Sequence, residues 1–275
     1  ANATLGGILI ANRGEIACRI LRACSEAGLK SVAVYANNDK ESMFVELATI
    51  SVELVGETIG ETYLDQQQIL DIAAMHGADA IHPGFGFLSE RADFARAVLD
   101  AGITWIGPSP LAIEMMGDKM TARKTMKAAG VPVIPGEEID FEDETKMIEA
   151  IVQASTRVGY PLLLKASSGG GGKGMRKVES SDNLVESIKG ARREAIAAFG
   201  DGRVYIERML TGSKHVEIQV LADTHGRVIH LGERECSVQR RHQKVFEEAP
   251  CATMTEEIRA AMGKAAVAAA MAVNY

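Results

Sequence analysis

Apolar residues recur in two rhythms along the N-terminal part of the chain. Four short apolar runs have the length of buried strands, at residues 8–11, 31–35, 78–81 and 103–106. Between the first two runs, Ile16, Ile20 and Cys24 recur every four residues before Gly28, as in a helix with a glycine stop. Similar spacing predicts helices around residues 69–73 and 94–99. Alternating strands and helices predict an α/β fold with a Rossmann-like, parallel-sheet N-terminal domain.

Polar loops follow two of these strands, at residues 12–15 and 82–87. Open parallel sheets bind ligands beyond the carboxyl ends of their strands, so both loops are candidate ligand contacts. Spacing alone favours a plainer interpretation, because surface ion pairs are common. In that interpretation Arg13 and Glu15 form an exposed ion pair, and His82 is a hydrogen-bonded loop histidine.

Two segments rich in proline and glycine, residues 107–110 and 131–136, break the rhythm and predict linkers. Ser109 can cap a short helix, and Asp118 can cap the next one. Lys119 falls in the first turn of that second helix, where a cation opposes the helix dipole unless an anion lies nearby. The alternative is a solvated lysine among the basic residues that follow it.

Residues 134–206 have the pattern of a small α+β unit. Helical spacing covers residues 148–158 and 184–199, and a glycine follows each helix. Apolar strand-like runs lie at residues 160–164, 175–179 and 203–208. Two helices on a small sheet, tethered by linkers, predict a mobile lid.

The lid contains the segment with the clearest chemistry, residues 165–176, where four consecutive glycines lie among Lys165, Lys173 and Arg176. Bare backbone N–H groups and positive charge suit the phosphates of a nucleotide. The segment fits neither the P-loop, because Gly174 follows Lys173, nor the dinucleotide fingerprint, because a strand follows rather than a helix. A strand, a glycine loop and a second strand predict a hairpin flap over phosphates. A flexible surface hairpin is the alternative.

The C-terminal part predicts antiparallel strands. In residues 215–220, apolar side chains alternate with His215, Glu217 and Gln219, so those three share the polar face. A turn at residues 224–226 and a return strand at 228–231 follow. Residues 233–244 carry too much charge for a core strand.

The chain closes on a predicted helix. Thr253 and Glu256 have the spacing of a capping box. Apolar residues follow at helical spacing through Ile258 and Met262. The remaining residues continue this helix to the end of the sequence.

Composition narrows the functional classes. The chain has 275 residues, 47% of them hydrophobic, and a net charge of −7, which argues against nucleic acid or an anionic membrane as partner. Four cysteines show no zinc or C-x-x-C spacing and indicate reduced thiols. With no signal peptide or membrane-length run, we expect a cytoplasmic protein, or a mitochondrial-matrix protein if the source is eukaryotic.

Six segments together resemble the biotin carboxylase domain of biotin-dependent carboxylases, an ATP-grasp fold. They are residues 12–17, 82–90, 116–119, 165–176, 215–223 and 239–244, in family order. The resemblance covers the chain from about Ile8 to Tyr275. It implies that ATP phosphorylates bicarbonate to carboxyphosphate, which then carboxylates biotin. It also implies four parts: an N-terminal domain at 1–107, linker helices at 108–133, an ATP-grasp lid at 134–206, and the beginning of the C-terminal ATP-grasp domain at 207–275.

The resemblance also implies roles for individual residues. Lys119 and Lys165 match phosphate-binding lysines, and Lys244 matches a lysine that helps bind bicarbonate. The residues that match the loop over the phosphates and the nucleotide pocket are Gly169, Gly170, Gly171, Gly172, Gly174, Met175, Glu207, Arg208, Leu210, His215, Gln239 and His242. His215 and Lys244 are the candidate catalytic residues.

Two departures from the family pattern change the expectations. The family often has tyrosine where this chain has Phe85, so any hydroxyl contact is lost there. Family carboxylates that bind Mg²⁺ or Mn²⁺ match no residue up to Tyr275, so we expect no metal ligand in this chain, a truncated C-terminal domain and no turnover by the chain alone.

The resemblance implies several partners for the complete protein: ATP, bicarbonate, biotin or a biotin carboxyl carrier domain, and a carboxyltransferase subunit or domain. It also allows a homo-oligomer. Two other functions stay open. The chain is a non-catalytic fragment that binds a nucleotide or a partner, or it is part of another ATP-grasp ligase.

Overall fold

The computed structural model describes residues 5–139, 141, 143–167, 175–241 and 243–275. The chain divides into two compact units, Ala1–Glu114 and Met115–Tyr275, which are taken here one at a time. Among the described residues, no helix is both long enough and apolar enough to cross a membrane.

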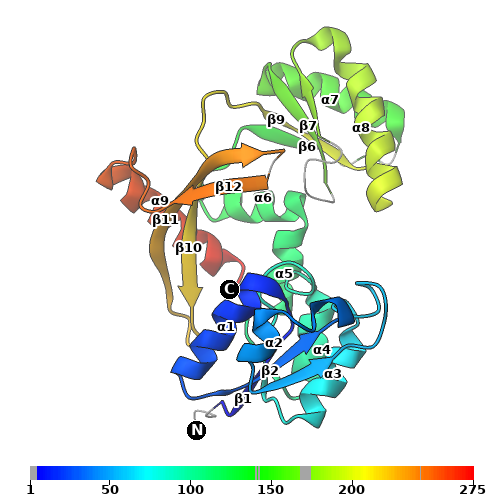
Figure 1. The fold of residues 1–275 in the computed structure, drawn as a ribbon. Coiled ribbons are helices and arrows are strands. Elements are labelled where there is room, and N and C mark those ends of the chain that lie inside the picture. Colours follow the sequence, from blue (N-terminus) through cyan, green and yellow to red (C-terminus); the bar gives the residue numbers. More distant parts are fainter. Residues whose placement is uncertain (1–4, 140, 142, 168–174, 242) are drawn as a thin grey trace. The chain divides into compact units, whose positions relative to one another are not determined.

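The first unit, which contains the strands labelled β1 and β2 in Figure 1, is built on a five-stranded parallel sheet. The order of its strands is β3-β2-β1-β4-β5. Its strands are β1 (Gly7–Ile10), β2 (Lys30–Tyr35), β3 (Ile50–Glu53), β4 (Ala80–His82) and β5 (Thr104–Trp105). Its helices are α1 (Gly14–Glu26), α2 (Met43–Leu47), α3 (Gln66–Met75) and α4 (Ala92–Asp100), with a 3-10 turn at Asn37–Asp39. The predicted Rossmann-like arrangement is confirmed.

Two apolar cores cover the two faces of this sheet. One core holds α3 and α4, where Phe94 packs edge-on against Trp105 with ring centroids 5.6 Å apart. The other core holds α1 and α2, with Leu21 and Phe44 buried. Burial on both faces explains why the strands are continuous apolar runs.

The second unit begins within α5 (Pro110–Gly117) and continues with α6 (Lys119–Ala128). The Asp118 side chain accepts the N–H of Thr121 at 2.8 Å, which confirms Asp118 as the N-cap of α6. The Ser109 hydroxyl likewise accepts the N–H of Ala112 at 3.2 Å at the start of α5.

The lid is a four-stranded antiparallel sheet with the order β6-β9-β7-β8. Its elements are β6 (Gly136–Ile139), α7 (Glu144–Val158), β7 (Leu162–Ala166), β8 (Arg176–Val178), α8 (Leu184–Phe199) and β9 (Val204–Arg208). Both helices share one apolar core with one face of the sheet. Strands β7 and β8 pair directly, as the predicted hairpin requires. Strand β6 was not predicted, because its Gly136-Glu137-Glu138 start lacks apolar residues.

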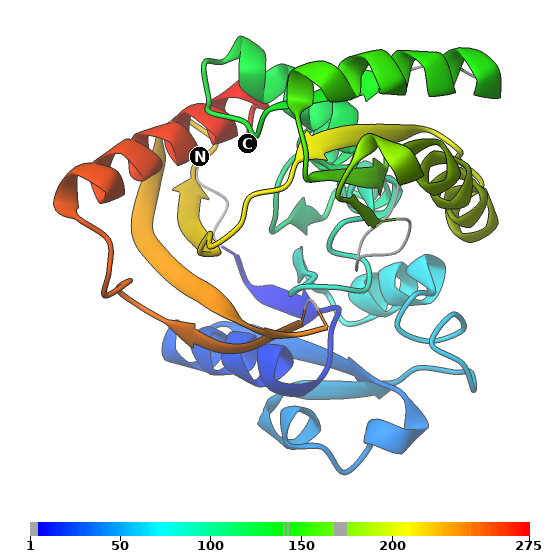
Figure 2. The ribbon, with the colours of Figure 1, turned by 90° about the horizontal axis from the view of Figure 1, so that it is seen from above.

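The last part of the second unit is a three-stranded antiparallel sheet of β10 (Val216–Ala222), β11 (Val228–Arg240) and β12 (Gln243–Glu248). Helix α9 (Glu256–Ala272) packs along β10 and β11 (Figure 2). At Gly263 a methyl group would lie 2.5 Å from Nε2 of His230, so this glycine permits the close approach of α9. Arg259 also binds the buried carboxylate of Glu233 at 2.9–3.0 Å.

The expectation that this charged segment is no core strand agrees with the structure: residues 233–240 lie in β11 and residues 243–244 in β12, and most of their side chains lie outside the core. One detail of the sequence-based prediction is corrected here. The cap of the last helix is Thr255, whose hydroxyl accepts the N–H of Ile258 at 3.4 Å, and not Thr253. The hydroxyl of Thr253 instead lies 3.6 Å from Sγ of Cys251.

Candidate nucleotide-binding site

Two of the predicted phosphate-binding lysines gather around one carboxylate in the second unit. Lys165 comes from β7, and its ammonium binds Oε2 of Glu207 on β9 at 2.6 Å. Lys119 begins α6. Its pKa lies below the usual value because burial disfavours the ammonium and Lys165 lies close, although Glu207 partly offsets this. A neighbouring anion would relieve this repulsion, as a phosphate does.

The same carboxylate has a third cationic neighbour that the sequence pattern did not single out. Arg123 lies one helical turn after Lys119 and binds Oε1 of Glu207 at 3.2 Å. The i, i+4 spacing of Lys119 and Arg123 was the available signal, because such residues share one face of a helix. Glu207 is 11% exposed and Lys165 is 25% exposed, so their pairing is only partly screened by water.

The structure describes only some of the other predicted nucleotide contacts. Arg208 binds the carbonyl oxygen of Val158 at 2.6 Å and so ties β9 to α7. Leu210 is exposed, and Met175 is half-buried just before β8. The glycines at 169–172 and 174, and also His242, lie outside the described residues.

A second polar cluster lies on one face of the β10–β12 sheet, where the alternation predicted it. Glu217 accepts two bonds from Arg234 at 2.7 and 2.9 Å and a further bond from Lys244. Burial alone would raise the pKa of Glu217, but these bonds outweigh it and lower the pKa. The bond to Glu217 also raises the pKa of Lys244, which stays cationic. A fixed cation here can hold a small anion.

His215 and Gln239 meet beside this cluster. Nε2 of Gln239 lies 2.7 Å from Nδ1 of His215, and Nε2 of His215 lies 3.9 Å from Glu217. The structure therefore brings together three predicted site residues, His215, Gln239 and Lys244. Arg234 was missed because its position opposite Glu217 depends on the strand register, which the sequence does not reveal.

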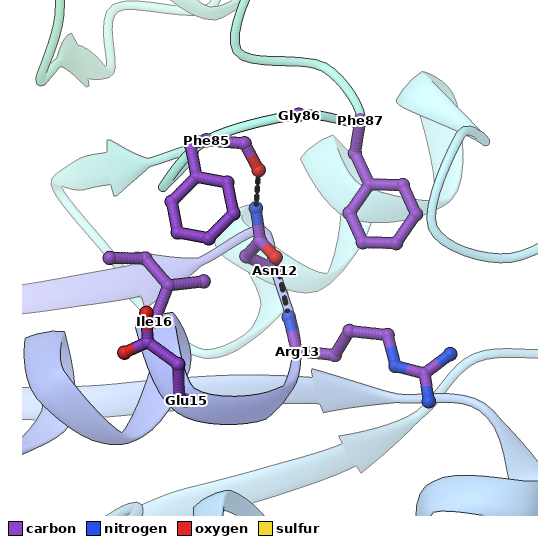
Figure 3. Close-up of a pocket in the computed structure, with 7 residues that line it drawn as sticks. All are labelled: Asn12, Arg13, Glu15, Ile16, Phe85, Gly86 and Phe87. Carbon is purple, nitrogen blue, oxygen red and sulfur yellow. Dashed lines mark hydrogen bonds between the residues drawn. The ribbon is translucent and has the colours of Figure 1, made fainter. Parts of the chain in front are cut away.

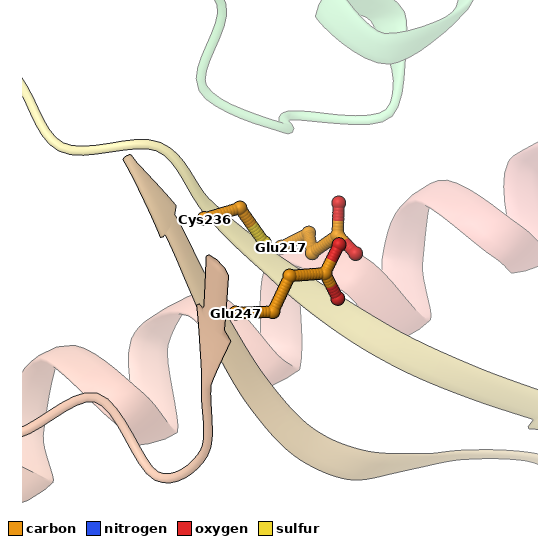
Figure 4. Close-up of side chains that lie close together, drawn as sticks. All are labelled: Glu217, Cys236 and Glu247. Atoms are coloured by element: carbon orange, nitrogen blue, oxygen red, sulfur yellow. The ribbon is translucent and has the colours of Figure 1, made fainter. Parts of the chain in front are cut away.

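Among the described residues, one group of side chains lies close enough together to hold a metal ion: Glu217, Cys236 and Glu247 (Figure 4). Mg²⁺ takes oxygen ligands, and a thiol does not suit it. Arg234 and Lys244 already neutralise Glu217. This cluster therefore does not fit the Mg²⁺ that ATP chemistry uses.

The first unit has a hollow of its own, of about 330 Å³, beyond the carboxyl ends of β1 and β4 (Figure 3). The side-chain amide of buried Asn12 donates to the carbonyl oxygens of Pro83 at 2.7 Å and of Phe85 at 2.8 Å, and this fixes the loop. The lining residues are Asn12, Arg13, Glu15, Ile16, Phe85, Gly86 and Phe87.

The polar residues near this hollow test the expectations of an Arg13–Glu15 ion pair and a hydrogen-bonded His82. Arg13 pairs with buried Asp39 at 2.8 Å rather than with Glu15. Asp39 also accepts the hydroxyl of Tyr63 at 2.6 Å. His82 is a hydrogen-bonded histidine as expected, because its Nδ1 accepts the N–H of Gly84 at 3.0 Å.

The predicted reduced thiols are also confirmed, since the four cysteines are free and buried.

Comparisons with known proteins agree with this architecture. Residues 4–113 match the family model "Biotin carboxylase, N-terminal domain", and residues 118–275 match "Carbamoyl-phosphate synthase L chain, ATP binding domain". The chain is 50% identical over 268 residues to the mitochondrial methylcrotonoyl-CoA carboxylase subunit alpha of Dictyostelium discoideum, covering 98% of this chain and 38% of that protein. It is 49% identical over 269 residues to biotin carboxylase 2 of Bacillus subtilis, covering 98% and 60%.

Solved structures give the same result. A biotin carboxylase complex with a β,γ-ATP ligand from Campylobacter jejuni superposes with a TM-score of 0.92 at 42% identity, covering 99% of this chain and 60% of that one. The biotin carboxylase domain of Hydrogenobacter thermophilus 2-oxoglutarate carboxylase, solved with MgADP, ADP and bicarbonate, gives 0.90 at 44% identity, covering 100% and 59%. The chain thus spans at most about three-fifths of these relatives. The fold, the order of the motifs and these matches place the chain in the biotin carboxylase family of ATP-grasp proteins.

Proposed function

We propose that this chain belongs to the biotin carboxylase component of a biotin-dependent carboxylase of the acyl-CoA or pyruvate type. One observation carries the proposal. Lys119 and Lys165 meet around Glu207, and Lys165 lies at the end of β7 that leads into the glycine-rich segment of the sequence, in a fold that matches a biotin carboxylase complex with β,γ-ATP. Two cations next to such a segment suit the phosphates of ATP. The partners proposed for the complete protein are bicarbonate, biotin on a carrier domain, and a carboxyltransferase.

The chemistry assigned to these residues is mainly electrostatic. A bicarbonate oxygen attacks the γ-phosphorus of ATP, the bond to the β-phosphate oxygen breaks, and carboxyphosphate and ADP form. Lys119 and Lys165 hold phosphate oxygens whose charge increases during this transfer. Lys244, held by Glu217, offers its ammonium to bicarbonate. Mg²⁺ would supply further charge neutralisation when bound, and the group of Glu217, Cys236 and Glu247 does not suit it, since one of its three ligands is a thiol.

In the second step, the carboxyl group of carboxyphosphate passes to the ureido nitrogen of biotin and inorganic phosphate leaves. This nitrogen loses a proton as the new C–N bond forms, and the departing inorganic phosphate is a base that can accept it. His215 and Gln239 lie beside Lys244 and Glu217, so they line the place where nucleotide and bicarbonate would meet. We assign them to positioning the nucleotide and its neighbours.

Phosphate release by the complete protein tests this proposal. We expect hydrolysis of ATP that requires both bicarbonate and biotin. Replacing Lys244 by methionine should abolish that biotin-dependent turnover while ATP still binds. Lys264→Met, an exposed lysine on α9, is the matched control and should retain wild-type turnover. A rate of ATP hydrolysis that is the same with and without bicarbonate and biotin would refute the proposal.

A further inference from the structure

A single guanidinium on α6 binds both ends of the lid. Arg123 is 13% exposed and donates to Oε1 of Glu207 at 3.2 Å. It also donates to the carbonyl oxygen of Gly136 at 3.3 Å and to that of Ile134. All four residues belong to the second unit, so the contacts lie within one compact body.

These contact points are where the chain enters and leaves the lid. Ile134 and Gly136 lead into β6, and Glu207 lies in β9, the last strand of the lid. The two strands pair at Gly136 and Glu207, and the N–H of Arg208 donates to the carbonyl oxygen of Pro135 at 2.8 Å. Arg123 therefore fastens a two-stranded hinge to the helix that begins with Lys119.

Strands β6 and β9 lie so close together at Gly136 that no side chain fits there. A methyl group on Gly136 would lie 2.4 Å from the carbonyl oxygen of Ile206 and 3.0 Å from Cγ of Glu207. Such contacts are closer than side chains can adopt without moving the backbone. The glycine brings β6 against β9, and this places Gly136 and Glu207 within reach of one guanidinium.

Arg123 also changes the charge available to a phosphate. Glu207 offers one oxygen to Arg123 and the other to Lys165. These two cations and one carboxylate together carry a net charge of +1. Without Arg123, Lys165 and Glu207 form a pair with no net charge. An incoming phosphate would then compete for Lys165 with a carboxylate that Arg123 no longer shares.

We propose that Arg123 is a positioning residue of the nucleotide site: it fixes the hinge of the lid to α6 and shares Glu207 so that Lys165 remains available for phosphate. This inference rests on the proposed nucleotide-binding function. It differs from a purely structural role, in which Arg123 would stabilise the fold and leave nucleotide affinity unchanged.

Arginine suits this position better than lysine. Its planar head presents five donors, so it reaches a carboxylate and two carbonyl oxygens at once. A lysine keeps the charge but has a compact ammonium with a different geometry. The substitution Arg123→Lys therefore separates charge from the multiple hinge contacts, whereas Arg123→Met removes both.

The experiment compares Arg123→Met, Arg123→Lys and Lys127→Met in the complete protein. Lys127 is exposed, lies one turn further along α6 and carries the same charge, so it is a matched control for charge removal. For each protein, calorimetry gives the dissociation constant for ATP, and hydrogen exchange gives the protection of backbone amides in β6 and β9. Thermal unfolding shows which variants are folded.

We expect Arg123→Met to weaken ATP binding about tenfold, the effect of losing one charge-assisted interaction. Exchange in β6 and β9 should become faster. In Arg123→Lys the affinity should stay within about threefold of wild type, since the charge is kept, while exchange is as fast as in Arg123→Met. Lys127→Met should match the wild type in both measurements.

The outcomes separate this inference from the proposed function. If the wild-type protein binds no ATP, the proposed function fails and the inference falls with it. If the wild type binds ATP and folded Arg123→Met binds equally well, the inference alone is overturned, and Arg123 is only structural. A loss in Lys127→Met equal to that in Arg123→Met would also overturn it, because any charge on α6 would then suffice.

Discussion

The role of Lys165 can be separated into a phosphate contact and a structural ion pair by one substitution, Lys165→Met. Methionine keeps the length and apolar character of the stem and removes the ammonium. In the structure this ammonium binds Oε2 of Glu207 at 2.6 Å and is 25% exposed. The two roles predict different results, because one concerns ligand affinity and the other concerns the stability of the lid.

The magnitude of each effect follows from the neighbours of Lys165. Removing a charge-assisted hydrogen bond to phosphate costs about 1.5–3 kcal/mol, or roughly a tenfold to hundredfold loss of ATP affinity. Stability should fall less, because Arg123 still binds the other oxygen of Glu207 at 3.2 Å. We expect a loss of about 1–2 kcal/mol, since the carboxylate keeps one charged partner. That corresponds to a melting temperature lower by several degrees, at about 2–4 °C per kcal/mol.

The assay measures ATP affinity by calorimetry and unfolding by thermal scan on the same purified protein. Lys177→Met is the matched control, because Lys177 lies on neighbouring β8 and its ion pair with Glu179 is exposed. It should change neither quantity appreciably. If Lys165→Met melts earlier but binds ATP as the wild type does, Lys165 is a structural partner of Glu207 and leaves the proposed site.

Three further predictions concern the first unit, where Trp105, the single tryptophan of the chain, reports unfolding by fluorescence. Asn12→Asp should lower the free energy of unfolding by about 2 kcal/mol or more, because a carboxylate cannot donate to the two carbonyl oxygens that Asn12 binds; wild-type stability would contradict the role of this amide. Burial and a nearby arginine lower the pKa of His82 from 6.5 to about 4, so the unfolded chain binds this proton more readily than the folded chain does. The free energy of unfolding should therefore fall by up to about 1.4 kcal/mol per pH unit as the pH drops from 6.5 to 4. His82→Gln should reduce this loss, and His76→Gln should keep it. An unchanged pH profile in His82→Gln would refute this. Phe94→Ala should cost about 3–5 kcal/mol in denaturant unfolding, because Phe94 is fully buried against Trp105, and a loss below about 1 kcal/mol would contradict that packing.

The fold was predictable wherever burial imposes a strong pattern on the sequence. The strands β1, β2 and β4 are apolar runs because helices cover both faces of the sheet. Helix α8 was readable from its spacing and from Gly200, which ends it in a left-handed conformation. Short or exposed elements were missed or found only in part. Strand β3 has half-buried residues and was missed. Only residues 228–231 of β11 were predicted, because the rest of β11 and all of β12 are charged and largely exposed.

The candidate site was predictable in its residue types but not in its pairings. A glycine-rich segment between lysines indicates phosphate chemistry, so Lys165 could be proposed from the sequence. Its bond to Glu207 joins residues 42 positions apart, and it forms because β7 and β9 are neighbours in the lid. The bond between Arg123 and Glu207 spans 84 positions and requires α6 to pack against the hinge. No local pattern encodes such distances.

The central claim is that ATP bound around Lys119 and Lys165 phosphorylates bicarbonate. The most direct test measures whether an oxygen atom passes from bicarbonate to the released phosphate. The complete protein is given ¹⁸O-labelled bicarbonate, ATP and biotin, and the released phosphate is analysed by mass spectrometry. If a bicarbonate oxygen attacks the γ-phosphorus, that oxygen stays with phosphorus when carboxyphosphate gives up its carboxyl group. We therefore predict biotin-dependent phosphate that carries ¹⁸O from bicarbonate. Phosphate without label, formed at the same rate, would mean that water is the attacking group and would contradict the account.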